Sequence, residues 1–188
     1  MKKKNKIIVF LGVDGSGKST IIKSLIKNNK NFETIHLVPR IFLRKYNKVI
    51  NPHNKKRRGK LFSFLKMIYW ILSYYLFEIV NLNKNKIFFF DRHIYDVIID
   101  PLRYRFSLSK KLTLKIISLI RKPDFIILMT GDPKKIYLRK KEVKLNDLVI
   151  LNNEYINYIK QFENKKILNS LDNLKTNEKK ILKILKKL

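Results

Sequence analysis

The sequence contains no cysteine and few of the residues that interrupt regular structure. Its 188 residues include only five glycines and five prolines. The lack of cysteine excludes disulfide bonds and thiolate chemistry and suits a reducing compartment, so we expect a cytoplasmic protein. Hydrophobic residues make up 45% and charged residues 30%, which is the composition of a globular chain. A chain of this length is expected to form a single domain, 1–188, with a substantial core.

Acidic residues are also scarce. Only 14 aspartates and glutamates face 43 lysines and arginines, so the formal net charge is +29. Such a charge would suit nucleic acid, an anionic membrane or polyanionic substrates. The codon bias of an A+T-rich genome explains it equally simply, and we favour that explanation because the lysines are scattered over the chain. We therefore expect no specific nucleic-acid partner. The dense patch at 55–60 is either a solvated loop or a contact with a polyanion or an anionic membrane surface.

No apolar run is predicted to cross a membrane. The basic start leads into a short apolar run without a small-residue cleavage site, which does not fit a signal peptide. The aromatic-rich stretch 61–82 is interrupted by Lys66 and Glu78, with eleven residues between them. It contains no helix breaker and predicts one long helix packed against a sheet. Some of its aromatic side chains could also line an acceptor pocket.

Three of the five glycines lie in one stretch, 12–20. It fits the pattern G-x-x-x-x-G-K-[ST] at every fixed position. The apolar run 7–11 before it is typical of a buried strand, and 19–27 after it has apolar residues at helical spacing. Strand, glycine-rich turn and helix predict a phosphate-binding loop. Its expected nucleotide-binding residues are Gly12, Asp14, Gly15, Ser16, Gly17, Lys18, Ser19 and Thr20.

The chemistry of this loop follows from its residue types. Glycines allow successive backbone N–H groups to turn inward around an anion, and the helix N-terminus adds its unpaired N–H groups. Lys18 is expected to reach the β- and γ-phosphates of ATP, and the Ser19 hydroxyl to hold Mg²⁺.

Strands and helices alternate along the chain. The predicted strands are 7–11, 34–38, 87–90, 125–129 and 165–169, and the predicted helices between and after them are 19–27, 61–82, 107–121, the segment opened by Asp132 and Pro133, 154–162 and 177–188. Five alternations imply a parallel sheet covered on both faces, an α/β three-layer fold.

Ligands bind at the carboxyl ends of the strands in open α/β sheets, and polar residues follow the predicted strands at these ends. Asp91 comes directly after a buried strand and is expected to hold Mg²⁺ beside the loop, with Arg92 on the transferred phosphoryl or the acceptor. Arg40 follows the second strand and is an expected anion contact. In the next segment, 94–105, Asp96 and Asp100 are four residues apart on one helical face, among arginines. Either this is an acceptor site or it is a salt-bridged surface turn.

The segment after Asp132-Pro133 ends in a basic run, Arg139-Lys140-Lys141. A basic helix tip above the phosphates could close over ATP and exclude water, so we expect a short lid at about 139–147. A solvated helix face would give the same pattern.

Together, the loop 10–20, Asp91-Arg92-His93 after a strand, and Asp132-Pro133 leading to Arg139-Lys140 resemble the thymidylate kinase-like group of P-loop kinases. The resemblance spans most of the chain, and its first two motifs are sharp. It implies a five-stranded parallel sheet, Mg·ATP as donor, a small acceptor and a homodimer. By this likeness Asp14 faces the acceptor sugar, Asp91 and Arg92 attend the metal and the acceptor phosphate, and Arg139 marks the lid.

The expected function is ATP-dependent phosphoryl transfer to a small acceptor, a nucleoside monophosphate such as dTMP. Transfer would use Lys18, Asp91, Arg92 and Arg139, and the acceptor would meet Asp14, Arg40, Arg92, Tyr95, Asp96 and Arg103. For a hydroxyl acceptor, Asp14 or Asp96 would serve as base. Two alternatives stay open. One is a kinase of a sugar or glycan, because the pattern over 91–105 also resembles relatives encoded beside surface-polysaccharide genes. The other is a non-catalytic ATP-binding module.

Overall fold

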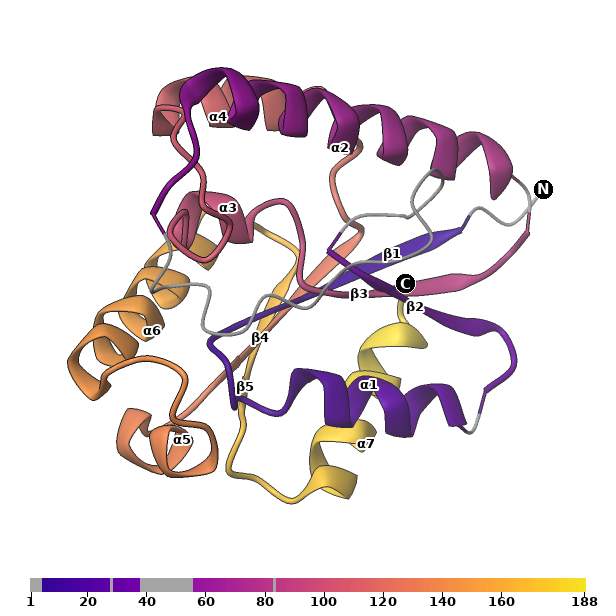
Figure 1. Ribbon diagram of the computed structural model, residues 1–188. Helices are drawn as coiled ribbons and strands as arrows, with labels where there is room; N and C mark the ends of the chain where they lie inside the picture. Colours follow the sequence, from indigo (N-terminus) through magenta and orange to yellow (C-terminus); the bar gives the residue numbers. More distant parts are fainter. Residues whose placement is uncertain (1–4, 28, 38–55, 83) are drawn as a thin grey trace.

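A single five-stranded parallel sheet organises the chain. The computed structural model describes residues 5–27, 29–37, 56–82 and 84–188. The strand order is β2-β3-β1-β4-β5, and every neighbouring pair is parallel (Figure 1). The strands are Lys6–Leu11 (β1), Phe32–His36 (β2), Ile87–Asp91 (β3), Phe125–Thr130 (β4) and Lys165–Asn169 (β5). The predicted α/β P-loop fold with five parallel strands is confirmed.

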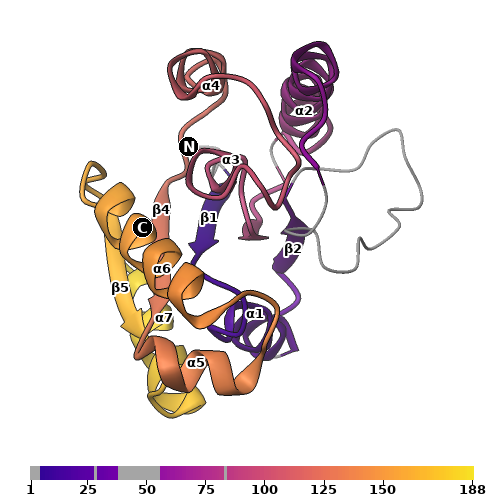
Figure 2. The ribbon, with the colours of Figure 1, turned by 60° about the vertical axis from the view of Figure 1, so that its left-hand side comes forward.

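Helices cover both faces of this sheet (Figures 1 and 2). One face carries α1 (Lys18–Lys27) and α7 (Leu174–Leu185), and the other carries α2 (Lys60–Val80), α3 (Asp96–Ile99), α4 (Lys110–Ile117) and α6 (Leu145–Ile159). The short α5 (Pro133–Arg139) leads into α6. The three-layer arrangement lets the inner strands β1, β3 and β4 bury both of their faces, which is why these three strands are largely apolar without alternation.

Strand β1 shows how one short run supplies two cores. Ile7, Val9 and Leu11 pack beneath α2 and α6, while Ile8 and Phe10 pack against α1 and α7. Side chains alternate across a strand, so odd and even residues enter opposite cores. All five are at most 3% exposed. This central position fixes the start of the phosphate loop at the carboxyl end of β1.

The carboxyl ends of three strands meet where the loop begins. In the parallel register Phe10 is level with Asp91, and His36 is level with Asp91 on the other side. Asp91 is therefore delivered beside the phosphate loop by strand pairing alone, as its position in the sequence predicted. Arg40, the predicted anion contact after the second strand, lies outside the described residues.

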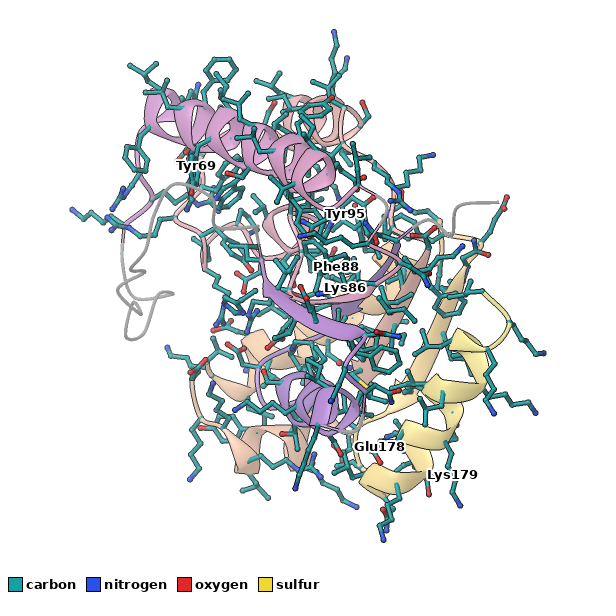
Figure 3. The ribbon with its side chains drawn as sticks, turned by 90° about the vertical axis from the view of Figure 1, so that its right-hand side faces the viewer. Tyr69, Lys86, Phe88, Tyr95, Glu178 and Lys179 are labelled. Carbon is teal, nitrogen blue, oxygen red and sulfur yellow. The ribbon has the colours of Figure 1, made fainter. Side chains whose placement is uncertain are left out.

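Helix α2 confirms the predicted long helix and adds an unexpected feature. Its inner side packs into the core, with Ser63, Met67, Trp70, Ile71, Ser73, Tyr74 and Phe77 buried. Its outer side is also apolar but exposed, and Figure 3 shows side chains projecting from it. Among the described helices, α2 alone is long and apolar enough to cross a membrane by length and composition. A helix that is apolar all round has two sides to cover, and the sheet covers one.

Several helix boundaries differ from the sequence prediction, most of all those of α4 and α6. Helix α4 occupies only Lys110–Ile117 of the expected 107–121, and Ser109 caps it by accepting from the backbone N–H of Leu112. Ser107 is held outside the helix because its hydroxyl donates to the carbonyl of Arg58 at 2.5 Å. Helix α6 begins at Leu145, earlier than the predicted 154, so the end of the predicted lid forms its first turn.

Candidate functional site

The phosphate loop joins β1 to α1 through backbone that only glycine adopts readily. Gly12 has a φ of 134°, and a Cβ there would lie 2.3 Å from the carbonyl oxygen of Met129. Gly15 has a φ of 81°, and a Cβ there would lie 3.1 Å from the Cβ of Lys140. The glycines therefore allow the loop to press against β4 on one side and the α5–α6 connection on the other. The predicted strand–loop–helix context is present in full.

Lys18 lies at the centre of this loop. Its Nζ donates to the carbonyl oxygens of Gly12 at 2.6 Å and Val13 at 2.8 Å, and to the Ser16 hydroxyl at 3.3 Å. Burial lowers the pKa of the amine, while the carboxylates of Asp91 and Asp96 act in the opposite direction. A lysine amine held at a phosphate-binding loop is placed to contact a phosphate group that binds there.

Ser19 and Asp91 form the second element of the site. The Ser19 hydroxyl donates to Oδ2 of Asp91 at 2.5 Å, joining the first turn of α1 to the end of β3. A hydroxyl and a carboxylate are hard oxygen donors of the kind that Mg²⁺ prefers. Magnesium at phosphate sites takes few protein ligands and completes its shell with water and substrate oxygens. In the described ranges no group of three or more His, Cys, Asp or Glu residues could hold a metal.

Asp14, inside the loop, is bracketed by two arginines. Arg92 Nη2 pairs with its Oδ1, and Arg103 Nη1 pairs with its Oδ2. The side chains of Asp14 and Arg92 are only 8% and 9% exposed. Burial alone would lower the pKa of Arg92, but the facing Tyr104 and Asp96 raise it overall, so the guanidinium stays charged. Arg92 also has a φ of 79°. This backbone conformation is uncommon for residues other than glycine, and where it occurs it is often at a functional site.

The connection between α5 and α6 is tied to this cluster. Glu142 Oε2 lies 3.8 Å from Arg103 Nη1, and Glu142 Oε1 lies 2.9 Å from Lys140 Nζ. The predicted lid, 139–147, thus includes this connection and the first turn of α6. Arg139 is directed elsewhere, since its Nη1 donates to the carbonyl of Ser170 after β5 at 3.0 Å. Sequence reasoning missed Glu142, because an acid in a basic run gives no sign of which arginine it will meet.

Asp96 lies fully buried behind Arg92. Its Oδ2 accepts from the backbone N–H of His93 at 2.7 Å, and its Oδ1 accepts from the Tyr155 hydroxyl at 2.5 Å. Burial raises the pKa of this carboxyl, while Arg92 acts against the rise. Tyr155 comes from α6 and lies within the helix that the sequence predicted at 154–162. Its role could not be read from the sequence, because a tyrosine at a core position looks the same with or without a buried acid to contact.

Tyr95, another predicted acceptor contact, packs into the core. Its ring contacts those of His93, Tyr158 and Phe162, and it is 5% exposed. The structure therefore gathers Lys18, Ser19 and Asp91 at the loop, and Asp14, Arg92 and Arg103 beside it. It places Tyr95 among apolar neighbours, as Figure 3 locates it between α2 and the sheet.

Solved structures share this fold. A thymidylate kinase from Candida albicans superimposes with a TM-score of 0.67 at 16% identity, over 98% of this chain and 92% of that one. A deoxyadenosine kinase from M. mycoides with the products dCMP and dCDP bound gives 0.64 at 18% identity, over 97% and 100%. The same kinase with bound dATP gives 0.63 at 19% identity, over 96% and 99%.

No protein-family model and no curated protein sequence matches the chain. Likeness at these identities establishes architecture. The chain has the thymidylate kinase-like P-loop kinase fold that its motifs predicted.

Proposed function

We propose that this protein is an ATP-dependent phosphotransferase that acts on a nucleoside monophosphate such as dTMP. The observation that carries the proposal is the convergence of two charge clusters on one loop. Lys18, Ser19 and Asp91 suit a nucleoside triphosphate with Mg²⁺, and Arg92 and Arg103 beside them suit a second anion. Two anion sites that share one loop are what transfer between phosphates requires.

The phosphate loop, together with Ser19 and Asp91, would bind the phosphate donor. Mg·ATP supplies the transferable γ-phosphoryl group when bound. Backbone N–H groups of the loop and the N-terminus of α1 would hold its phosphates, and Lys18 would neutralise charge on the transferred group. Ser19 and Asp91 would orient Mg²⁺. This division of roles uses positioning and charge rather than covalent chemistry.

The acceptor side favours a phosphate over a hydroxyl. A hydroxyl needs a base, and four carboxylates lie at or beside the loop. Asp14 is held by two arginines, Asp91 accepts from Ser19, Asp96 accepts two hydrogen bonds in the core, and Glu142 pairs with Lys140. A nucleoside monophosphate brings its own anionic nucleophile and needs no base. Arg92 and Arg103 would hold that phosphate, with Asp14 keeping both guanidiniums in place and facing the sugar.

The connection at 139–147 would act as the lid. It already meets the loop at Gly15 and the acceptor cluster through Glu142, so closure would exclude water from both anion sites together. Arg139 would join the transferred phosphate only if its contact with Ser170 opens. We assign that movement to nucleotide binding.

An acceptor panel tests the proposal. ADP release from Mg·ATP is measured with nucleoside monophosphates, with nucleosides, including deoxyadenosine, and with sugars. Lys18→Ala serves as the control for contaminating kinases. Turnover with monophosphates that Lys18→Ala abolishes supports the proposal. Turnover confined to nucleosides or sugars would assign a hydroxyl acceptor and make Asp96 the base to examine. ATP binding without turnover on any acceptor would favour a non-catalytic module.

A further inference from the structure

The backbone at Arg92 is fixed by contacts on both sides. Its φ is 79°, and a conformation this rare for a residue other than glycine persists only where its surroundings hold it. Before it, Asp91 ends β3 in register with Phe10. After it, the N–H of the peptide that joins Arg92 to His93 donates to Oδ2 of Asp96 at 2.7 Å. The Asp96 carboxylate therefore holds the backbone on the side of Arg92 where β3 has ended.

The second oxygen of Asp96 is held from α6. Oδ1 accepts from the Tyr155 hydroxyl at 2.5 Å, and both side chains are buried. A buried carboxylate stays charged only with hydrogen-bond donors and positive charge nearby. Burial raises the pKa of Asp96, whereas the charge of Arg92 and the two hydrogen bonds lower it. Tyr155 thus supplies one of the two hydrogen bonds that keep this acid in place behind Arg92.

Tyr155 is suited to act as the donor, and its helix is firmly placed. Burial and the adjacent Asp96 raise the pKa of the hydroxyl well above its ordinary value, so the phenol keeps its proton. One turn earlier on α6, Asn152 Oδ1 accepts from the hydroxyl of Thr130, the last residue of β4, at 2.7 Å. Helix α6 also packs beside α3, which begins with Asp96 (Figure 1). One helix therefore contacts the end of a central strand and the segment that follows Arg92.

We propose that Asp96 and Tyr155 are positioning residues that aim the Arg92 guanidinium at the phosphate of the acceptor. The guanidinium is buried and pairs with Asp14, so its direction depends on the buried groups around it. Neither positioning residue would touch the acceptor or ATP. Asp96 would act through Arg92, and Tyr155 would act through Asp96. The inference rests on the proposed function, because it takes the acceptor phosphate to bind Arg92.

Tyr155→Phe removes the hydroxyl and keeps the ring. We expect KM for dTMP to rise about tenfold and KM for ATP to stay the same, because a hydrogen bond to a charged group behind Arg92 is lost. Tyr158→Phe on the same helix is the matched control, since the Tyr158 hydroxyl has no hydrogen bond within the described part of the chain. A purely structural role would lower kcat through the folded fraction and leave both KM values unchanged. That result would overturn the proposal.

A double variant tests whether the two residues act as a unit. Asp96→Asn removes the negative charge behind Arg92 and should raise KM for dTMP by more than Tyr155→Phe does. In Asp96→Asn/Tyr155→Phe the KM should match that of Asp96→Asn alone, because Tyr155 acts only through the carboxylate. Effects that multiply in the double variant would mean that Tyr155 acts by another route, and they would contradict the proposal.

Amide hydrogen exchange tests the positioning in the free protein, without any substrate. Tyr155→Phe should lower the protection of the His93 amide about tenfold relative to that of Phe90 in β3, and Tyr158→Phe should not. Unchanged protection at His93 in Tyr155→Phe would overturn the inference even if dTMP is a substrate. Lowered protection, in a protein whose wild type turns over no nucleoside monophosphate, would support the hold on Arg92 and overturn the proposed acceptor.

Discussion

Ser19 Oγ donates a hydrogen bond to Asp91 Oδ2 at 2.5 Å, across 72 residues of sequence. The bond joins the first turn of α1 to the carboxyl end of β3, and these are the two oxygens that we assign to Mg²⁺. Strand pairing brings them together, because Asp91 is level with the last residues of β1 in the parallel register. The pair therefore couples the central sheet to the metal chemistry proposed for the loop.

Asp91→Asn keeps the size of this side chain and removes its charge. We expect kcat to fall by about 10²- to 10³-fold and the magnesium dependence to move to higher concentration, because the developing charge loses its metal-orienting partner. Titration of activity with Mg²⁺ at saturating ATP measures both effects. Ser19→Thr retains a hydroxyl and should retain activity. An Asp91→Asn protein with normal magnesium dependence would remove Asp91 from the metal site.

Arg103→Ala tests the acceptor side. The arginine pairs with Asp14 and lies near Glu142, so its loss should raise KM for the acceptor by about 10- to 100-fold with little change in KM for ATP. Arg105→Ala is the matched control, since Arg105 Nε donates to the carbonyl of Lys56 away from the loop. Steady-state kinetics with each substrate varied in turn separate the two constants. An equal rise in both KM values would assign Arg103 to general stability of the loop.

Gly12→Ala tests the geometry of the phosphate loop. A Cβ would meet the carbonyl oxygen of Met129 at 2.3 Å in a backbone with φ of 134°, so we expect a loss of about 1–3 kcal/mol or more in unfolding free energy, together with loss of ATP binding. Gly59→Ala is the control, because nothing lies within 4 Å of a Cβ there and its φ is −57°. Urea unfolding and ATP titration calorimetry measure the two effects. Wild-type ATP affinity in Gly12→Ala would contradict the close approach to β4.

Burial of His93 makes the free energy of unfolding depend on pH. Burial lowers its pKa from 6.5 to about 3, so between these values the unfolded chain binds a proton that the folded chain does not. Stability is therefore fully present above pH 6.5 and is lost as the pH falls toward 3. When the pH falls from 7 to 5, this residue should lower the free energy of unfolding by about 2 kcal/mol.

His93→Phe preserves an aromatic ring among Phe90, Tyr74 and Tyr95 and removes the titration. Urea unfolding at pH 7 and pH 5 compares the variant with the wild type. The difference in unfolding free energy between the two pH values should shrink by the His93 contribution. An unchanged difference would show that other groups carry the acid sensitivity.

The sequence predicted the parts of the site that are local in the chain. The phosphate loop needs glycines, a lysine and a hydroxyl at fixed spacing, so one short stretch determines Gly12, Lys18 and Ser19. Asp91 was predicted because parallel strands align their carboxyl ends. The five strands followed from apolar runs bounded by turns, and the long helix followed from the absence of a breaker.

The remaining features depend on contacts between distant segments. Glu142 meets Arg103 across the lid connection, and Tyr155 of α6 meets Asp96 from the segment after β3. Neither pair has a sequence signature, because the geometry that joins them is set by how α6 packs on the sheet. The exposed side of α2 was missed for a related reason. An apolar helix pattern does not say how many of its sides the rest of the chain will cover.

The most direct test of the account is the formation of nucleoside diphosphate from dTMP or another nucleoside monophosphate with Mg·ATP, followed by chromatography of the products. The account predicts steady production of diphosphate and ADP in equal amounts by the wild type, reduced about 10³-fold or more in Lys18→Ala. Absence of diphosphate from every nucleoside monophosphate, or production that Lys18→Ala leaves unchanged, would contradict it.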